Sequence, residues 1–342
     1  STVGEICFNT SISGYQEILT DPSYCGQIVT MTAPHIGNYG TNPDDMESST
    51  IHASALVVTQ LTQIPSNWRS NKSLSDFLWE FKVPVMEGVD TRALVRVLRS
   101  DGEVKGLMVP SDSLHTLDLL REEAMALPSM EGRNLARVVS TKEPYFWPAE
   151  TEGFPLKVVA YDFGIKRNIL RLMAALGINI TIVPWDTPAE LVRQMDPDGI
   201  FLSNGPGDPA AVESAIEVVR SLLGVFPIFG ICLGHQILAL ALNCKTYKLK
   251  CGHHGGNHPV MDYQTNKIEI TSHNHGFSVD EDSLPEDVRV THRNLNDQTV
   301  EGLESLQYPA YSIQYHPEAA PGPRDARYLF KRFVEMMGNT KR

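Results

Sequence analysis

The residues best suited to chemistry stand in the run Gly-Ile-Cys-Leu-Gly at positions 230–234. This run follows an apolar stretch of strand length and precedes the apolar helical run 237–242, so it predicts a strand-to-helix turn. A nucleophile between glycines at such a turn is lifted above the sheet, and the helix N-terminus lowers the pKa of a thiol. We therefore predict that Cys232 is a nucleophile rather than a small buried core cysteine. For the other cysteines the structural interpretation is favoured: Cys7, Cys25, Cys244 and Cys251.

A cysteine nucleophile needs a base that handles its proton and a third group that orients the base. The tripeptide His316-Pro317-Glu318 supplies both, at the end of a strand predicted over 310–316. A lone histidine is more often structural, so the assignment depends on the elbow. A strand that ends at the same edge of the sheet as the elbow presents both side chains to the sulfur. We predict His316 as the base and Glu318 as its orienter.

A third candidate element is the loop Ser-Asn-Gly-Pro-Gly-Asp-Pro at 203–209, which follows another apolar strand. Glycines let backbone N–H groups approach a substrate closely, as an oxyanion hole or a carboxylate clamp requires. The alternative is an ordinary tight turn. A phosphate-binding loop is disfavoured because no Gly-Lys-Ser/Thr follows.

Apolar runs of strand length alternate with segments of helical period from about residue 156 onward. This alternation is typical of a parallel sheet with helices on both faces, and the predicted strands are 156–162, 178–184, 199–203 and 227–231. Beyond residue 245 shorter extended pieces are predicted at 267–272, 288–292 and 310–316, then a terminal helix at 324–337. We expect a doubly wound, mostly parallel α/β domain over 156–342, extended by mixed or antiparallel strands.

The pattern of residues 1–140 predicts a separate, smaller α+β domain. Extended segments are predicted at 4–10, 27–32 and 53–59, and helices at 74–81, 91–99 and 114–126. Residues 141–155 are expected to be a linker, since prolines and a glycine interrupt any regular element there.

Length and composition limit the class of protein. A chain of 342 residues exceeds one ordinary core, so two domains are expected. The formal charge of -12, with no basic run, disfavours nucleic-acid binding. The 5 cysteines are widely spaced without a CxxC pair, which argues against a disulfide framework or a zinc site and favours a reducing cytoplasm. No signal peptide is visible, and the apolar stretch 224–242 predicts a buried strand and helix rather than a membrane span.

The three motifs together resemble, in order and spacing, those of class I (triad) glutamine amidotransferases: Gly-Ile-Cys-Leu-Gly-His-Gln, Ser-Asn-Gly-Pro-Gly-Asp-Pro and His-Pro-Glu. The resemblance implies a flavodoxin-like fold and attack of Cys232 on the side-chain amide of glutamine. Backbone N–H groups near Gly205 and Leu233 would hold the oxyanion. His316 would protonate the departing ammonia and then serve as base while water hydrolyses the glutamyl thioester.

The rest of the chain is similar to the small subunit of carbamoyl phosphate synthetase, through the motifs at 14–24, 34–40, 88–92, 161–168 and 274–277. The similarity covers essentially every residue, including the N-terminal domain that other triad amidotransferases lack. It implies these glutamine-binding positions: Ser23, Gly205, Gly207, Leu233, Gln236, Asn274, Gly276 and Phe277. Because Ser23 belongs to the other domain, the pocket is expected at the domain interface. The family also has a leading segment, roughly a pair of strands, before Thr2, so the chain is expected to begin inside its first domain.

The resemblance further implies a large partner subunit that uses ATP, Mg²⁺ and bicarbonate, while this chain needs no cofactor and no metal. Ammonia would pass through an intersubunit channel and yield carbamoyl phosphate for arginine and pyrimidine biosynthesis. Cys232 is typical of the glutamine-using branch rather than of the branch that has serine and uses free ammonia. The alternatives are another triad amidotransferase, a stand-alone cysteine hydrolase, or an idle scaffold subunit, which an intact Cys232, His316 and Glu318 disfavour.

Overall fold

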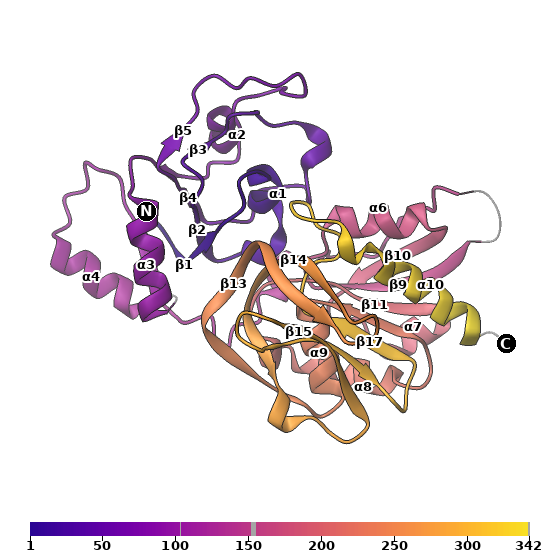
Figure 1. Ribbon diagram of the computed structural model, residues 1–342. Coiled ribbons are helices and arrows are strands. Elements are labelled where there is room, and N and C mark those ends of the chain that lie inside the picture. The colour runs from indigo at the N-terminus through magenta and orange to yellow at the C-terminus, as the bar shows by residue number, and fades with distance from the viewer. Residues whose placement is uncertain (103, 152–154, 341–342) are drawn as a thin grey trace.

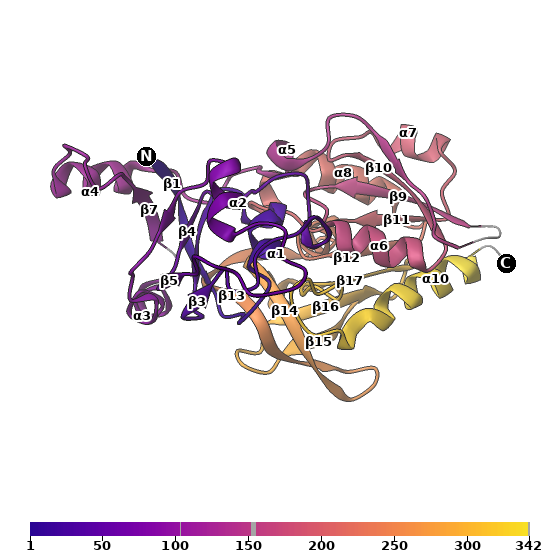
Figure 2. The same cartoon turned by 90° about the horizontal axis from the view of Figure 1, so that it is seen from above.

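A computed structural model describes residues 1–102, 104–151 and 155–340 of the chain (Figures 1 and 2). Its N-terminal unit is built on a five-stranded sheet in the order β6-β4-β2-β1-β7, in which only β7 runs antiparallel to its neighbour. These strands are β1 (Thr2–Asn9), β2 (Gln27–Met31), β4 (Ala55–Val57), β6 (Val85–Met86) and β7 (Val104–Met108). A separate pair joins β3 (His35–Ile36) to β5 (Gln60–Leu61).

Helices complete the N-terminal unit: α1 (Tyr15–Thr20), α2 (Leu74–Glu80), α3 (Thr91–Asp101) and α4 (Leu117–Ala126). The short helix α5 (Ala136–Val139) packs on the unit that follows, since Ala136 is buried in one cluster with Val159 and Val219. One core cluster packs buried side chains of α1 and α2, including Leu19 and Leu78, against strand residues such as Val29. The predicted helix at 114–126 begins later, at Leu117, because the Thr116 hydroxyl accepts a hydrogen bond from the Leu119 N–H and caps it.

A ten-stranded sheet forms the second unit, in the order β14-β13-β15-β16-β17-β12-β11-β9-β10-β8. Five neighbouring strands, β17 to β10 in that order, are parallel. Four of them correspond to the strands that the alternating pattern predicts, and β17 comes from the region where mixed or antiparallel strands were expected. They are β9 (Leu156–Asp162), β10 (Ile178–Pro184), β11 (Gly199–Leu202), β12 (Ile228–Ile231) and β17 (Ala310–Ile313). The other strands are β8 (Tyr145–Trp147), β13 (Lys245–Asp262), β14 (Lys267–Asp280), β15 (Val288–Asn294) and β16 (Val300–Ser305).

Helices cover both faces of the parallel core, as in a doubly wound fold. On one face Val192, Val219 and Ile237 belong to one buried cluster, and on the other Ile169 and Phe333 belong to a second. The helices are α6 (Arg167–Ala175), α7 (Ala189–Gln194), α8 (Glu213–Leu222), α9 (Leu233–Ala241) and α10 (Tyr328–Thr340). No helix in the described part of the chain is long and apolar enough to cross a membrane.

The long antiparallel ribbon of β13 and β14 differs from the prediction of short extended pieces beyond residue 245 (Figure 1). Its Gly- and His-rich run at 251–258 lacks the apolar–polar alternation that identifies a strand. Two shifts of register accommodate this run, between Lys248 and His253 and between Gly255 and His258. The strand therefore forms through pairing with β14, and bulges re-aim its side chains.

The expected linker at 141–155 includes residues 152–154, which lie outside the described residues. The prediction that prolines exclude regular structure there is wrong, because β8 pairs antiparallel with β10. Pro144 and Pro148 lie just outside this three-residue strand at the edge of the sheet, where a missing N–H interrupts no ladder. Two further bounds differ: α9 begins at once after Cys232, and a short 3₁₀ turn at Asp325–Arg327 precedes α10.

Parallel pairing brings the carboxyl ends of β9, β11, β12 and β17 to one edge of the sheet. Ile231 lies opposite Ile313, so the residues that follow β12 and β17 emerge side by side. The loop after β11 emerges next to them, since Leu202 lies opposite Gly230. This edge is where ligands bind in open α/β sheets, and it carries the loop at 203–209, the turn at 230–234 and the tripeptide 316–318.

The two units meet where α6 begins. The backbone N–H of Arg167 donates to the Glu47 carbonyl at 2.8 Å, and that of Asn168 donates to Glu47 Oε2 at 2.9 Å. The preceding Lys166 provides no side-chain cap, so a buried glutamate from the N-terminal unit caps this helix and complements its dipole.

Replacement of Glu47 by alanine is expected to lower the free energy of unfolding by about 1–3 kcal/mol, because a buried N–H loses its acceptor. The Glu190→Ala variant is the control, since Glu190 forms only an exposed ion pair with Arg193 and should change stability by less than about 1 kcal/mol. Urea denaturation followed by tryptophan fluorescence measures both. Equal midpoints for the two variants would contradict the cap.

Candidate active site

Cys232 occupies a strained turn between β12 and α9. Its φ of 54° and ψ of -105° fall outside the regions that a side chain normally adopts. The Cys232 N–H donates to the Ile313 carbonyl at 2.9 Å, and the Gly234 N–H donates to the Ser203 carbonyl at 2.9 Å, so two neighbouring strand ends hold the turn. Such strain costs about 1–3 kcal/mol and persists only where the surroundings enforce it.

The flanking glycines are required by close backbone contacts. A Cβ on Gly234 would lie 2.2 Å from the Leu202 carbonyl oxygen, and a Cβ on Gly230 would lie 2.6 Å from the Gly234 carbonyl oxygen. Any side chain at either position would displace α9 from the sheet and move Cys232 with it. The predicted nucleophile elbow is therefore present, with the cysteine at the first turn of a buried helix.

His316 and Glu318 lie beside the cysteine, below the surface. His316 Nδ1 is 2.7 Å from Glu318 Oε1, which orients the ring and leaves Nε2 for the sulfur. Among the residues that the structure describes, His316 Nε2 has no hydrogen-bond partner. Glu318 is fully buried and also accepts from Lys166 Nζ at 2.9 Å, while the same ammonium donates to the Ala319 carbonyl at 2.7 Å.

These charges set one another's protonation. Burial alone would lower the pKa of His316, but the Glu318 carboxylate and the Cys232 sulfur outweigh it and raise the pKa to about 10. Burial would raise the pKa of Glu318, but Lys166 and His316 lower it to about 2. Burial would lower the pKa of Lys166, but Glu318, with other nearby carboxylates, raises it. At neutral pH the cluster is a buried row of cation, anion and cation, with its imidazolium end towards Cys232 Sγ.

A narrow pocket opens above Cys232, with a cavity volume of about 30 Å³. Its wall includes all but one of the glutamine-binding positions that the resemblance implies: Ser23, Gly205, Gly207, Gln236, Asn274, Gly276 and Phe277. Leu233 is absent from the wall as a side chain, since it is buried at the start of α9. His316 and Glu318 are also not part of the wall.

Several polar groups around the sulfur have no internal partner. The backbone N–H groups of Gly205 and Leu233 have no acceptor within residues 1–102, 104–151 and 155–340. Asn274 Nδ2 is likewise a buried donor without a partner in these ranges, while its Oδ1 lies 3.0 Å from His254 Nδ1. Buried donors are rarely left unpaired, so these groups are arranged to bind the oxygens of a ligand.

Ser23, from the N-terminal unit, lines the pocket. Asn204 Nδ2 donates to Ser23 Oγ at 2.9 Å and lies 3.4 Å from Asp21 Oδ1, and Asn204 Oδ1 accepts from the Lys166 N–H at 3.2 Å. Asn204 thus joins the interface of the two units to the lysine that contacts Glu318. The pocket lies at this interface.

Sequence reasoning missed several residues of the site. Lys166 and Asn204 were read only as parts of motifs, and Glu5 and Gln27 of the pocket wall were not identified. The signal for these last two lies in strand pairing, because Glu5 pairs with Gln27 across β1 and β2. Pairing registers cannot be read before the order of strands is known.

We expect Lys166→Met to lower the free energy of unfolding by about 3–5 kcal/mol, because it leaves the Glu318 carboxylate buried with one partner fewer. The Lys72→Met variant is the matched control, since Lys72 pairs with Glu80 in solvent and should cost less than about 1 kcal/mol. Urea titration at pH 7 measures the difference. A Lys166→Met protein as stable as the control would show that the buried ammonium does not stabilise the cluster.

Comparison with known proteins agrees with this arrangement over both units. Residues 159–336 match the family described as glutamine amidotransferase class-I, and residues 1–108 match the carbamoyl-phosphate synthase small chain, CPSase domain. The carbamoyl phosphate synthase small chain of Syntrophotalea carbinolica is 54% identical over 98% of this chain and 91% of its own length. Those of Thermosynechococcus vestitus and Escherichia coli K12 are 52% and 50% identical, over 98% of this chain and 91% and 92% of theirs. The chain belongs to the carbamoyl phosphate synthase small chain family.

Proposed function

We propose that this chain is the glutaminase subunit of a carbamoyl phosphate synthase, and that it hydrolyses glutamine through a thioester on Cys232. The observation that carries the proposal is the strained Cys232 beside His316 and Glu318, at the floor of a pocket lined with unpaired donors. An idle scaffold would have no reason to hold the backbone of a cysteine in this conformation. The family match over 1–108 speaks against the other triad amidotransferases.

In the first half of the reaction, the Cys232 thiolate attacks the side-chain amide carbon of glutamine, and the C=O π electrons move onto the oxygen. The oxygen becomes an oxyanion within reach of the Gly205 and Leu233 N–H groups, whose unpaired state provides stabilisation without reorganisation. The raised pKa of His316 keeps its ring protonated at neutral pH, so the proton for the leaving nitrogen is already present. The C–N bond breaks, ammonia departs, and the acyl group remains on sulfur.

In the second half, His316 has given up its proton and is a neutral base. It takes a proton from water, whose oxygen attacks the thioester carbon, and the C–S bond breaks to release glutamate and the thiolate. Glu318 keeps the ring oriented throughout and stabilises its charged form, and Lys166 keeps Glu318 ionised.

We assign recognition of the rest of glutamine to the pocket wall. The unpaired Asn274 Nδ2 suits the carboxylate or amide oxygen of the substrate. Gln236 Nε2 already donates to the Phe277 carbonyl and to Gln314 Oε1, which leaves its own carbonyl oxygen free to accept from the amino group. Ser23, Gly207 and Gly276 complete the wall, and no metal is required for such recognition.

The ammonia is proposed to pass through an enclosed path to a large subunit that uses ATP, Mg²⁺ and bicarbonate. Ammonia released into water would be protonated and would lose its nucleophilicity, which is why enclosure is needed. We further propose that residues 1–140 and 156–342 are separate domains joined at 141–155, and that the enzyme works in the cytoplasm. The five cysteines are widely spaced and form no CxxC pair, a pattern that favours a reducing compartment.

The test is synthesis of carbamoyl phosphate by this chain mixed with a carbamoyl phosphate synthase large chain. With Cys232→Ser, synthesis from glutamine is expected to fall by a factor on the order of 10³ or more, because the thioester cannot form. Synthesis from added ammonium chloride is expected to persist, because it bypasses this site. Glutamine-dependent synthesis that is unchanged by the substitution would overturn the proposal.

Cys244→Ser serves as the control, because Cys244 is a buried free cysteine that lies in the core beside α9, away from the pocket wall. It is expected to retain both activities. Loss of glutamine-dependent synthesis in both variants would attribute the effect to the fold rather than to the nucleophile.

A further inference from the structure

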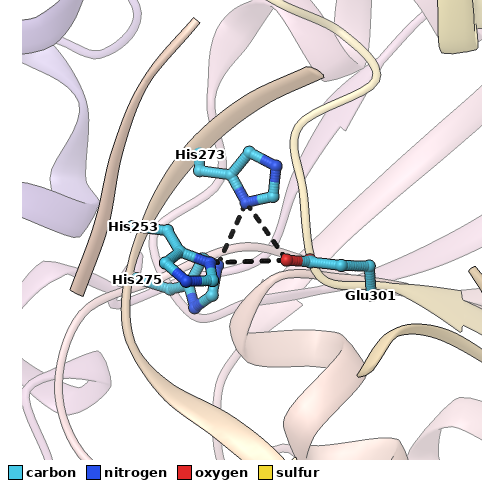
Figure 3. A group of neighbouring side chains, drawn as sticks. All are labelled: His253, His273, His275 and Glu301. Atoms are coloured by element: carbon cyan, nitrogen blue, oxygen red, sulfur yellow. Dashed lines mark hydrogen bonds and ion pairs between the residues drawn. The ribbon is translucent and has the colours of Figure 1, made fainter. Parts of the chain in front are cut away.

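Four buried side chains converge next to the pocket, from three strands of the mixed part of the sheet, and one of them, His275, also lines the pocket (Figure 3). His253 comes from β13, His273 and His275 from β14, and Glu301 from β16. One ligand atom from each lies within 4.8 Å of all the others. The two β14 histidines are two residues apart, so they project from the same face of the strand.

The distances between these atoms suit a small tetrahedral cation. Zinc bonds of about 2.0–2.1 Å at tetrahedral angles place neighbouring ligand atoms about 3.3–3.4 Å apart. His273 Nδ1 is 3.1 Å from His275 Nε2, His253 Nδ1 is 3.4 Å from Glu301 Oε1, and His273 Nδ1 is 3.7 Å from the same oxygen. Small rotations of side chains would complete the geometry.

Hydrogen bonds on the outer side assign the protons of the two β14 histidines. His275 Nδ1 lies 2.9 Å from the Phe277 carbonyl, which only accepts, so Nδ1 carries the proton and Nε2 is a free lone pair. The Thr271 hydroxyl gives its proton to the His258 carbonyl at 2.9 Å, so it accepts from His273 Nε2 at 2.7 Å. In neutral rings, His273 Nδ1 and His275 Nε2 therefore face each other as two lone pairs with no proton between them.

His253 repeats this arrangement. Its Nε2 lies 2.6 Å from the Asp297 carboxylate, which accepts the ring proton and leaves Nδ1 towards Glu301. Neither His253 Nδ1 nor Glu301 Oε2 has a hydrogen-bond partner among the residues that the structure describes. Asn294 Nδ2 donates to Glu301 Oε1 at 2.9 Å and orients the carboxylate. Each ligand is thus held from outside, as ligands of protein metal sites are.

We propose that His253, His273, His275 and Glu301 form a binding site for a divalent transition-metal ion of the zinc type. Three imidazoles and one carboxylate are unsuited to Ca²⁺ or Mg²⁺, which take oxygen ligands. Four protein ligands leave no open position for a reactant, so the role is structural. The ion links β13, β14 and β16, and it stiffens the pocket wall, because His275 stands between Asn274 and Gly276. The proposal does not depend on the glutaminase assignment.

The test uses the full chain with the Cys232→Ser substitution, so that the thiol cannot capture the metal. Metal-free protein is titrated with Zn²⁺ against a chromophoric chelator and, separately, with Co²⁺. We expect one Zn²⁺ per chain with a dissociation constant well below about 1 µM, typical of structural zinc. Bound Co²⁺ is expected to give the strong visible bands of tetrahedral coordination without a thiolate charge-transfer band.

In the same background, His273→Gln and Glu301→Gln are expected to abolish the cobalt bands and to weaken Zn²⁺ binding at least about 100-fold. Asp297→Asn, which changes only an outer partner, should weaken it about 10–100-fold. His292→Gln is the matched control, since His292 is a buried histidine of β15 outside the ligand set, and it should bind Zn²⁺ normally. A dissociation constant above about 1 µM, or equal binding by His273→Gln and His292→Gln, would overturn the proposal.

Discussion

The buried row of Lys166, Glu318 and His316 is the interaction on which the active site depends. A carboxylate without solvent is unstable unless cations compensate it, and here one cation lies on each side. The row extends from α6 to the end of β17, two elements that no backbone pairing connects. Lys166 holds the Glu318 carboxylate in place, and the His316 ring lies beside Cys232 Sγ. The charges that stabilise this edge of the sheet therefore also keep the proposed catalytic histidine protonated.

The architecture follows from the need to deliver these charges and the nucleophile to one place. Parallel strands end together, so the proposed nucleophile after β12 and the proposed base after β17 meet without any long-range adjustment. The N-terminal unit then covers the open side of this edge. It contributes the Glu47 cap of α6 and the Ser23 contact to Asn204, and both contacts abut the segment that holds Lys166.

Sequence reasoning succeeded where local pattern and topology act together. The elbow, the loop after β11 and the base after β17 follow from alternating apolar runs, which determine where strand ends converge. Sequence reasoning failed where the partners are far apart in the chain. Lys166 pairs with Glu318 across 152 positions, and no pattern in either segment predicts this ion pair. The β13 ribbon and its histidines were missed for a related reason, since Gly- and His-rich strands lack alternation and become strands only through pairing.

The Ser23–Asn204 contact spans 181 positions of sequence, so the two walls of the pocket belong to different units of the chain. A ligand in that pocket contacts both units and so stabilises their docked arrangement. By thermodynamic reciprocity, whatever factor tightens the docking of the units tightens glutamine binding equally, and glutamine returns the same factor to the docking. The affinity of the proposed glutamine pocket therefore depends on how tightly the two units dock. A protein that binds both units at once can change that affinity.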